Sequence, residues 1–442
     1  MGKLRIATAA IAALALLSTA CAASDGVAEA TLAASATTPL EVTLTDFAIS
    51  PADLAVPADE PVSVRVTNAG QSPHTYGVRV GDQTYETSLL DPGGSEVLVL
   101  PALEAGSYEA LCTVPGHDRL GMVGTVTAGG GASTGATATP HDHASMTAEE
   151  MAAGHERGVQ DFLAGGVTDT RGGRPLTPTI VDGIKVFELT VSEIRWEVEA
   201  GRFEQALAFN GQVPGPEIRV RRGDRVRFLV HNQMSQPFAL HFHGVTVPND
   251  QDGVPFVTQP PIMPGEYWTY EFQIVDPPGL YVYHSHFNAA EQVSRGLYGA
   301  LIVEPPRGEW RSVYGVEPDV EFTMFLGDGP LGYTLNGKSF PATEPIVAGR
   351  GDVVLIHISN DGDLLHPMHL HGFHFLVVGK DGFPLSREDR YLADTLVVAP
   401  GERYDLLVRA DLPGAWAFHC HVLTHVEGPS GMFGMVTALV VE

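Results

Sequence analysis

The chain has 442 residues, of which 44% are hydrophobic and 18% are charged. This length suggests about three domains of roughly 100–200 residues each. The 26 basic and 53 acidic residues give a formal net charge of −27, which argues against nucleic acid or an anionic membrane surface as a binding partner.

Residues 1–20 have the pattern of an export signal, because two basic residues precede an apolar run that is too short to span a bilayer comfortably. The run ends in LSTAC at Cys21 and resembles a bacterial lipoprotein signal, in which the cysteine is lipidated. Ordinary cleavage one or two residues later is the alternative. In either case we expect an exported protein, at the cell surface, in the periplasm or outside the cell, with residues 21–38 as a tether.

Short runs of alternating apolar and polar residues begin the first expected domain, residues 39–128, and indicate an all-β fold. Residues 129–178 read as a linker that is rich in Gly, Ala, Ser and Thr. We expect one amphipathic helix within it, from Ser145 to about Gly165, with Ser145 or Thr147 as the N-cap. Strand patterns then resume and continue to the end, which gives expected domains at residues 179–306 and 307–442.

Two sequence elements recur in all three expected domains. A strand that ends in asparagine occurs at Asn68, Asn232 and Asn360. A glycine followed by a strand leads to Cys112, Ser285 and Cys420. The domains therefore read as three copies of one β-rich unit.

Alignment of the copies places histidines and cysteines at equivalent positions. Six residues after the asparagines stand His74, Phe238 and His366, and five residues after Cys112, Ser285 and Cys420 stand His117, Ala290 and His425. The last two domains also carry four His-x-His pairs: His241 with His243, His284 with His286, His369 with His371, and His419 with His421. The first domain thus has a His/Cys/His set alone, the second has the pairs alone, and the third has both.

This partition points to copper. A thiolate, two imidazoles and a thioether form the ligand set of a blue copper site. If residues 419–421 end a strand, alternation sends Cys420 to one face and His419 and His421 to the other. Cys420 can then bind one metal while its neighbours, with the remaining His-x-His pairs, bind a polynuclear copper site behind it.

The four histidine segments HFH243, HSH286, HPMHLH371 and HCHVLTH425 resemble the signature segments of multicopper oxidases, the laccase-like enzymes. The resemblance covers about residues 178–442, which holds two cupredoxin domains. Residues 40–127 separately resemble a small blue copper protein such as plastocyanin or pseudoazurin. The resemblance implies three cupredoxin-like Greek-key β-sandwich domains, two of which form the oxidase.

The resemblance implies two type 1 copper sites. In the first domain the ligands would be His74, Cys112, His117 and Met122. In the third they would be His366, Cys420, His425 and Met432. The family usually places the axial residue five positions after the last histidine, where this chain has Ser430. A bulged loop could deliver Met432; otherwise Met435 takes the place, or the site has no thioether ligand.

The eight paired histidines would hold a trinuclear cluster, with His241 and His369 at type 2 copper and the other six at the type 3 pair. The implied reaction is the four-electron reduction of O2 to water, with electrons passing from Cys420 through His419 and His421. Asp252, in NDQDGVP255, matches an acid that family members place near the cluster. We expect it to relay protons; the alternative is that it only caps a turn.

Three functions compete at this stage. A laccase-like oxidase of phenols, aromatic amines or an electron-donor protein fits best. A cuprous or other metal-ion oxidase is the alternative. A copper nitrite reductase is disfavoured, because Phe238 and Ser285 remove the blue copper that such enzymes carry in the first of their two domains. Two-domain relatives build the cluster between neighbouring subunits, so we expect a homotrimer.

Overall fold

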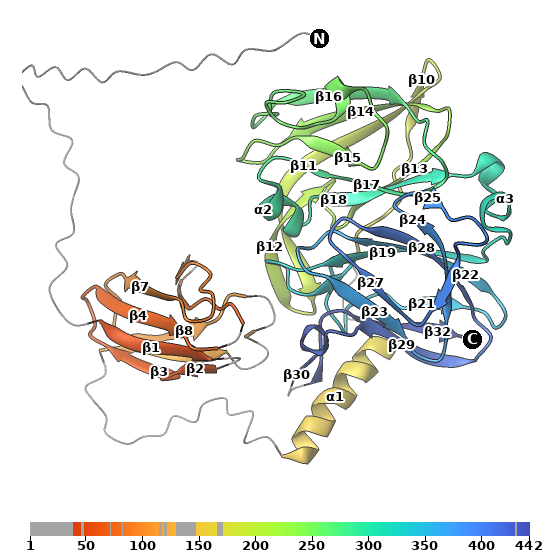
Figure 1. Ribbon diagram of the computed structural model, residues 1–442. Coiled ribbons are helices and arrows are strands. Elements are labelled where there is room, and N and C mark those ends of the chain that lie inside the picture. Colours follow the sequence, from red (N-terminus) through yellow and green to blue (C-terminus); the bar gives the residue numbers. More distant parts are fainter. Residues whose placement is uncertain are drawn as a thin grey trace, which may run out of the picture. The chain divides into compact units, whose positions relative to one another are not determined.

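The structure is a computed structural model that describes residues 39–45, 48–70, 72–81, 83–114, 117–118, 122–129, 147–165, 171–428 and 431–442. The expected export signal, the lipidation site Cys21 and the tether lie outside the described residues. Among the described residues, no helix is both long enough and apolar enough to cross a membrane. The expected all-β class with cupredoxin-like sandwiches is confirmed (Figure 1).

The first domain is a sandwich of two sheets, ordered β2-β1-β4-β7 and β3-β9-β8-β5-β6. Its interior is a single apolar cluster that includes Val64, Leu100 and the copper-ligand candidates Cys112 and Met122. Its strands are β1 (Leu40–Thr45), β2 (Ala48–Ser50), β3 (Asp53–Val56), β4 (Val62–Asn68), β5 (Gly77–Val80), β6 (Gln83–Glu86), β7 (Ser95–Leu100), β8 (Gly106–Leu111) and β9 (Val123–Ala128).

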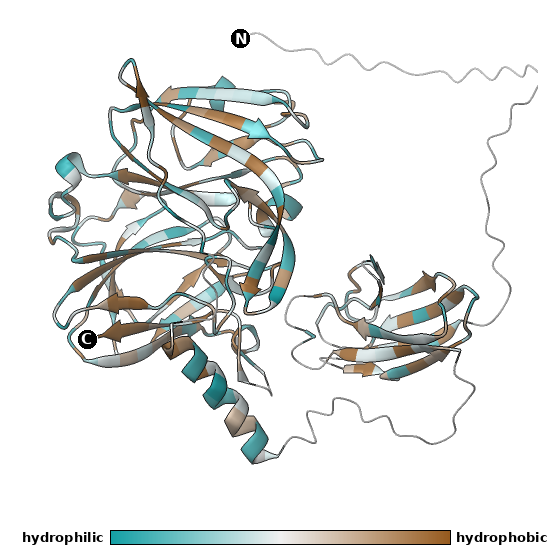
Figure 2. Ribbon diagram, turned by 180° about the vertical axis from the view of Figure 1, so that it is seen from behind, coloured by the Kyte–Doolittle hydropathy of each residue, from teal (hydrophilic) through white to brown (hydrophobic). Residues whose placement is uncertain are grey.

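The linker helix is α1 (Ala148–Leu163), and of the two expected N-cap residues it uses Thr147. The Thr147 side chain accepts from the Glu150 N–H while the Glu150 carboxylate accepts from the Thr147 N–H, which is a capping box. Figure 2 colours most of α1 hydrophilic, with hydrophobic residues at the end that meets the sandwich. There Phe162 packs against Phe340 of the last domain, with ring centroids 5.3 Å apart.

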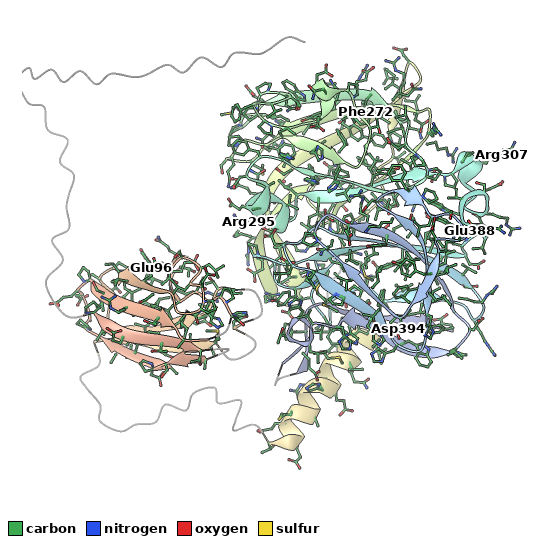
Figure 3. The ribbon with its side chains drawn as sticks, viewed as in Figure 1. Glu96, Phe272, Arg295, Arg307, Glu388 and Asp394 are labelled. Atoms are coloured by element: carbon green, nitrogen blue, oxygen red, sulfur yellow. The ribbon has the colours of Figure 1, made fainter. Side chains whose placement is uncertain are left out.

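The middle domain has one sheet ordered β10-β11-β14-β16, with β12 paired to β11, and a second ordered β13-β18-β17-β15. Phe272, labelled in Figure 3, belongs to the aromatic core between them. The elements are β10 (Thr179–Val181), β11 (Ile184–Glu199), β12 (Arg202–Phe209), β13 (Gly215–Arg221), β14 (Arg225–Asn232), β15 (Leu240–His243), η2 (Asn249–Gln251), β16 (Tyr267–Gln273), β17 (Gly279–Ser285), α2 (Ala289–Ser294) and β18 (Tyr298–Glu304).

The last domain repeats the plan, with sheets ordered β20-β19-β22-β28-β24-β25 and β21-β32-β29-β23-β27; β26 pairs with β24, and β30 with β31. Its elements are η3 (Pro306–Gly308), α3 (Arg311–Tyr314), β19 (Val320–Gly327), β20 (Thr334–Leu335), β21 (Ile346–Ala348), β22 (Val353–Asn360), β23 (His366–Leu370), β24 (Phe375–Lys380), β25 (Phe383–Pro384), β26 (Tyr391–Ala393), β27 (Thr395–Val398), β28 (Arg403–Arg409), β29 (Gly414–Cys420), η4 (Leu423–His425), β30 (Glu427–Gly428), β31 (Gly431–Met432) and β32 (Val436–Val441).

The short helices α2 and α3 add to the single helix that the sequence predicts. Both are shorter than the 10–12 residues that a helical period needs to become visible in a sequence. They lie in connections between strands and leave the all-β architecture unchanged.

The three repeated asparagines each hold one loop onto the sheet. Asn68, Asn232 and Asn360 are fully buried, and each donates from Nδ2 to two backbone carbonyls while its Oδ1 accepts a backbone N–H two residues on. A buried amide with all these bonds made is stabilising, whereas an unsatisfied one is costly. The clamp therefore fixes the loop that carries His74, Phe238 or His366, six residues after the asparagine.

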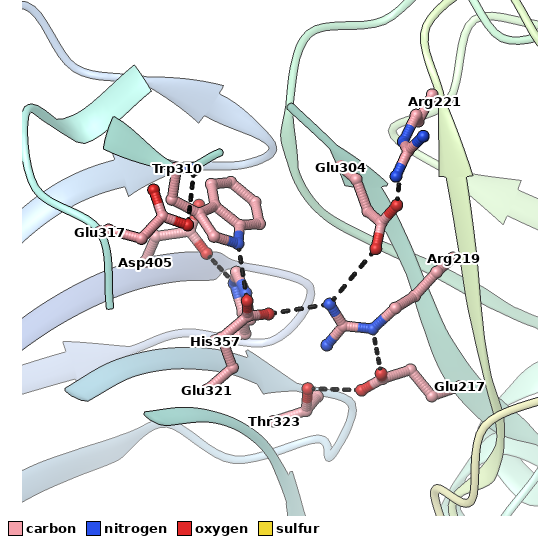
Figure 4. Close-up of polar contacts among 10 residues, drawn as sticks. All are labelled: Glu217, Arg219, Arg221, Glu304, Trp310, Glu317, Glu321, Thr323, His357 and Asp405. Carbon is pink, nitrogen blue, oxygen red and sulfur yellow. Dashed lines mark hydrogen bonds and ion pairs between the residues drawn. The ribbon is translucent and has the colours of Figure 1, made fainter. Parts of the chain in front are cut away.

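The middle and last domains meet through an apolar cluster and a polar network (Figure 4). Arg219 on β13 bonds to Glu217 of its own strand and to Glu321 on β19, and the Glu321 carboxylate also accepts from Trp310 Nε1. The charges of these carboxylates outweigh the effect of burial and raise the pKa of Arg219 above its usual value. These contacts fix the two sandwiches to each other and so set the spacing of their histidines.

Candidate metal centres

The first domain brings its predicted ligands together at one end of the sandwich. His74 follows β4, Cys112 follows β8, and Met122 stands directly before β9. Cys112 Sγ lies 4.0 Å from His74 Nδ1 and 3.5 Å from His117 Nδ1, and the two nitrogens are 3.0 Å apart. All four predicted ligands are buried.

The last domain holds a second set with the same geometry. His366 begins β23, Cys420 ends β29, and His425 lies in η4. Cys420 Sγ lies 3.7 Å from both His366 Nδ1 and His425 Nδ1, and these nitrogens are 3.3 Å apart. Each histidine thus turns Nδ1 towards the sulfur.

In each set, the cysteine sulfur and the two Nδ1 atoms form a triangle of the size that a small cation requires. In each, the point equidistant from sulfur and the two nitrogens lies about 2.1 Å from each atom, close to the roughly 2.0–2.3 Å of metal–imidazole and metal–thiolate bonds. Burial raises the pKa of Cys420 to about 11, so the thiolate forms only with a cation beside it. Burial and the neighbouring His366 lower the pKa of His425 to about 4, which keeps the imidazole neutral for binding. The donor sets therefore fit copper.

Two residues beside the second set were not predicted from the sequence. Asp328, just after β19, accepts a hydrogen bond of 2.8 Å from His366 Nε2 and also accepts from the backbone N–H groups of Asp363 and Leu364. The Tyr333 ring stacks on His425 at 4.0 Å. Both lie more than 30 residues before their partners, and no local motif signals them.

The middle domain gathers four predicted ligands: His241, His243, His284 and His286. Strand pairing places His241 opposite His284, and the rings lie 5.2 Å apart. His241 Nδ1 donates to the Asp252 carbonyl, and His284 Nδ1 to the Ser285 carbonyl. These bonds fix the tautomer in which Nε2 is free to bind a metal. Burial, and to a smaller extent the charges of Arg403 and His241, lower the pKa of His243 to about 4.

The last domain gathers the other four: His369, His371, His419 and His421. Pairing of β23 with β29 places His369 opposite His419. His369 Nδ1 donates to the Asp394 carbonyl and His419 Nδ1 to the Cys420 carbonyl, as in the middle domain. His371 Nε2 and His419 Nε2 lie 3.0 Å apart, a separation at which both can face one ion.

The two histidine sets remain separate within one chain. Among the described residues, every short ring contact of these eight histidines joins two members of the same set. The neighbouring imidazoles that lower the pKa of His284 and of His419 also belong to their own sets. Each chain thus presents two separate sets of four histidines, which are called half-sites below because a shared metal site is the proposal.

An acid stands beside each half-site. The Asp252 Oδ1 lies 3.4 Å from His241 Nδ1. Asp394, labelled in Figure 3, has its Oδ1 4.0 Å from His369 Nδ1. The resemblance of NDQDGVP255 to a family segment singled out Asp252, whereas the sequence analysis missed Asp394. The backbone carbonyl of each residue accepts a hydrogen bond from a histidine Nδ1.

In the middle domain, Phe238 and Ser285 stand where the other two domains have a histidine and a cysteine. The buried Phe238 ring packs edge-on against Phe209. Ser285 Oγ donates to Gln292 Oε1 of α2 at 2.6 Å. No sulfur or imidazole stands at these positions, as the alignment of repeats predicts.

The two methionines near His425 lie in different surroundings. Met432 is half-buried in β31 and pairs with Glu427 in a short hairpin. Met435 is fully buried in the core and stands directly before β32.

Comparisons with known proteins agree with this arrangement. The family profile described as "Multicopper oxidase" matches residues 190–308 and, with a second profile of the same description, residues 314–441; a "Cupredoxin-like domain" profile matches residues 7–127. A solved structure, "Multicopper Oxidase mgLAC", is 37% identical and has a TM-score of 0.54 over 58% of this chain and 86% of that one.

Curated relatives match over similar stretches. A "Probable nitrite reductase-hydroxylamine oxidoreductase fusion protein" of Kuenenia stuttgartiensis is 32% identical over 58% of this chain and 31% of its own length. "Dihydrogeodin oxidase" of Aspergillus terreus is 32% identical over 51% of this chain and 42% of its own length. The chain thus spans less than half the length of either relative.

Proposed function

Since this chain belongs to the multicopper oxidase family, we propose that it oxidises a reductant one electron at a time and reduces O2 to water. The observation that carries the proposal is the position of Cys420. Its sulfur belongs to the His366/His425 set, and its peptide neighbours His419 and His421 belong to a half-site of the eight-histidine set. One residue thus links the two kinds of metal centre.

The residues divide the work as follows. Copper, when bound, would supply one-electron redox chemistry, and the four electrons that O2 requires come from four one-electron oxidations of the reductant. His366, Cys420 and His425 hold the copper that meets the reductant, and the eight paired histidines hold the site for O2. Asp252 is the proposed proton relay of this site, which is supported by the 3.4 Å separation of its Oδ1 from His241 Nδ1.

We propose that the O2 site forms between copies of the chain, with four histidines from the middle domain of one copy and four from the last domain of the next. This is supported by the absence of ring contacts between the two sets among the described residues. A closed ring of such heterologous contacts gives a cyclic oligomer, and the resemblance to two-domain oxidases makes a homotrimer the proposed one.

The surroundings of the last-domain blue set favour an aromatic reductant. Leu364, Leu365 and Leu423, which come shortly before His366 and His425, are 46%, 53% and 55% exposed. Exposed apolar residues in this number beside a metal ligand suit the flat ring of a phenol or an aromatic amine. The net charge of −27 also favours a neutral or cationic reductant over an anion.

Oxygen uptake tests the proposal. The copper-loaded protein is given a phenol, cuprous ion or a reduced small electron carrier, and O2 consumption is measured with and without nitrite. We expect uptake with at least one donor and none with the Cys420→Ser variant. Nitrite turnover without O2 uptake would overturn the oxidase reading and support the nitrite reductase that one relative's name suggests.

The N-terminal blue set supports a second proposal, that it passes electrons to the oxidase part. Cys112→Ser removes its thiolate without touching the oxidase ligands. We expect this variant to lose O2 uptake with at least one donor while it keeps the Cys420-dependent blue absorption. Unchanged turnover with every donor would reject the role.

The expected attachment of the chain to a membrane through a lipidated Cys21 remains a proposal, supported by the signal-like residues 1–20. Mass spectrometry of the exported protein tests it. A lipid-modified N-terminal cysteine supports it, whereas an unmodified N-terminus at residue 22 or 23 contradicts it.

A further inference from the structure

The last domain has an unusually long loop between its second histidine ligand and the strand that follows. In the first domain, Met122 comes five residues after His117, and β9 begins at the next residue. In the last domain, β32 begins at Val436, eleven residues after His425. Spacing alone therefore does not identify the thioether donor.

Backbone hydrogen bonds identify the equivalent position. In the first domain, the Cys112 N–H donates to the Met122 carbonyl, and the Met122 N–H to the His117 carbonyl. In the last domain, the Cys420 N–H donates to the Met435 carbonyl and the Met435 N–H to the His425 carbonyl. Met435 thus occupies the position of Met122 in both bonds.

The strand register gives the same correspondence between Met435 and Met122. Val123 pairs with Leu111, the residue before Cys112, and Val436 pairs with His419, the residue before Cys420. The middle domain follows the same rule: the Ser285 N–H donates to the Leu297 carbonyl, and Tyr298 pairs with His284. The sequences after Leu297 and Met435, YGALIVE and VTALVVE, also align without a gap.

The longer loop contains two short paired strands, β30 and β31, and α1 contacts them. Met432 pairs with Glu427, and the Glu427 carboxylate lies 3.5 Å from His155 Nδ1 of α1. A side chain at Gly431 would meet the Gly154 carbonyl at 3.4 Å, so helix and hairpin are in backbone contact. Met432 is half-buried there, whereas Met435 and Met122 are fully buried in their cores.

We propose that Met435, and not Met432, is the axial thioether donor of the last-domain blue copper site, and that the five extra residues of this loop are accommodated by the paired strands β30 and β31, which α1 contacts. This rests on the proposed function, in which His366, Cys420 and His425 hold a type 1 copper. A weak thioether bond tunes such a site, so its replacement changes the spectrum and the reduction potential.

Matched variants test the assignment in a Cys112→Ser background, which leaves one blue copper to observe. Met435→Gln and Met435→Leu are compared with Met432→Gln and Met432→Leu by visible absorption, electron paramagnetic resonance and redox titration. We expect both Met435 variants to change the spectrum, with a lower potential for Gln and a higher one for Leu. The Met432 variants should match the parent.

A changed spectrum for the Met432 variants, with none for Met435, overturns the inference, and so does an unchanged spectrum for all four. A crystal structure of the copper-loaded Cys112→Ser protein gives an answer that does not depend on how the Met435 variants fold: copper bonded to Met435 Sδ supports the inference, and copper without that bond overturns it. If the Cys112→Ser parent binds no blue copper at all, the proposed function fails instead.

Discussion

Each proposed histidine ligand has a second hydrogen bond or a ring contact. His241, His284, His369 and His419 donate from Nδ1 to backbone carbonyls, which leaves Nε2 for a metal. The blue-set histidines instead turn Nδ1 towards the cysteine sulfur, and His366 donates from its other nitrogen, Nε2, to Asp328. The nitrogen that faces the metal position is Nε2 in these four paired histidines and Nδ1 in the blue sets, and this difference distinguishes the two kinds of site.

Asp328→Asn tests this orientation. A carboxylate that accepts from His366 Nε2 stabilises the more positive, oxidised copper better than an amide does. Since charged hydrogen bonds exceed neutral ones by about 1 kcal/mol, we expect the reduction potential to rise by on the order of 60 mV or less. Redox titration of the blue band in the Cys112→Ser background measures it. A lower potential in the variant would contradict the role.

At the residue scale the sequence predicts candidate ligands but not the residues that contact them. The spacing Cys-x4-His and the His-x-His pairs are local, so all four histidine segments could be assigned from the chain alone. Asp328 and Tyr333 reach His366 and His425 only because β19 and its following loop pack beside β23 and η4. Such contacts depend on sheet order, which no local spacing encodes.

At the scale of elements, the asparagine clamp is what makes the repeated units equivalent. The sequence shows the repeated asparagine at a strand end, but only the structure shows that its side chain holds the following loop. For the longer loop after His425, in contrast, the sequence and the structure favour different residues. The sequence suggests Met432 by nearness, whereas backbone register favours Met435.

Asn360→Ala should both destabilise the protein and disturb the copper that the following loop ligates. Loss of three buried hydrogen bonds costs about 2–4 kcal/mol at roughly 1 kcal/mol each, and release of the His366 loop should alter the blue spectrum. Asn232→Ala is the matched control, because its loop leads to Phe238 and no blue copper. Thermal unfolding and absorption are measured together; equal blue spectra in the two variants would contradict the clamp's role.

A buried His–Asp pair gives the last domain a pH dependence. His357 on β22 bonds to Asp405 on β28 at 2.5 Å, and the same carboxylate accepts from Tyr314 of α3. Burial opposes the charged imidazole, but the charge of Asp405 and its hydrogen bond prevail and raise the pKa of His357. A raised pKa contributes stability that is fully present below the unfolded value of about 6.5 and is lost as pH rises through the folded value.

His357→Gln should therefore cost most at low pH. We expect a loss of about 3 kcal/mol near pH 6, typical of breaking a buried pair, and a smaller loss as pH rises above the unfolded pKa. Unfolding curves of both proteins across this range measure the difference. A difference that grows with pH would contradict the assigned charge of the pair.

At the scale of the whole molecule, the alignment of repeats predicts eight histidine ligands but not where they meet. That information lies in the packing of the two sandwiches, which the Arg219–Glu321 contact and the shared apolar cluster hold in one arrangement. This packing leaves the half-sites without mutual ring contacts. This is the basis of the proposal that a second copy of the chain supplies the other four ligands.

Subunit mixing tests this central claim most directly. One variant carries His241→Ala and His243→Ala, and a second carries His369→Ala and His371→Ala, so each chain lacks one half-site. The two are produced together, and O2 uptake per protein is compared with each variant alone and with the unaltered chain. If neighbouring chains share the site, random assembly restores roughly a quarter of the full activity, because half of the chains offer each intact half-site. If the mixture is as inactive as the separate variants, the site lies within one chain and the account is contradicted.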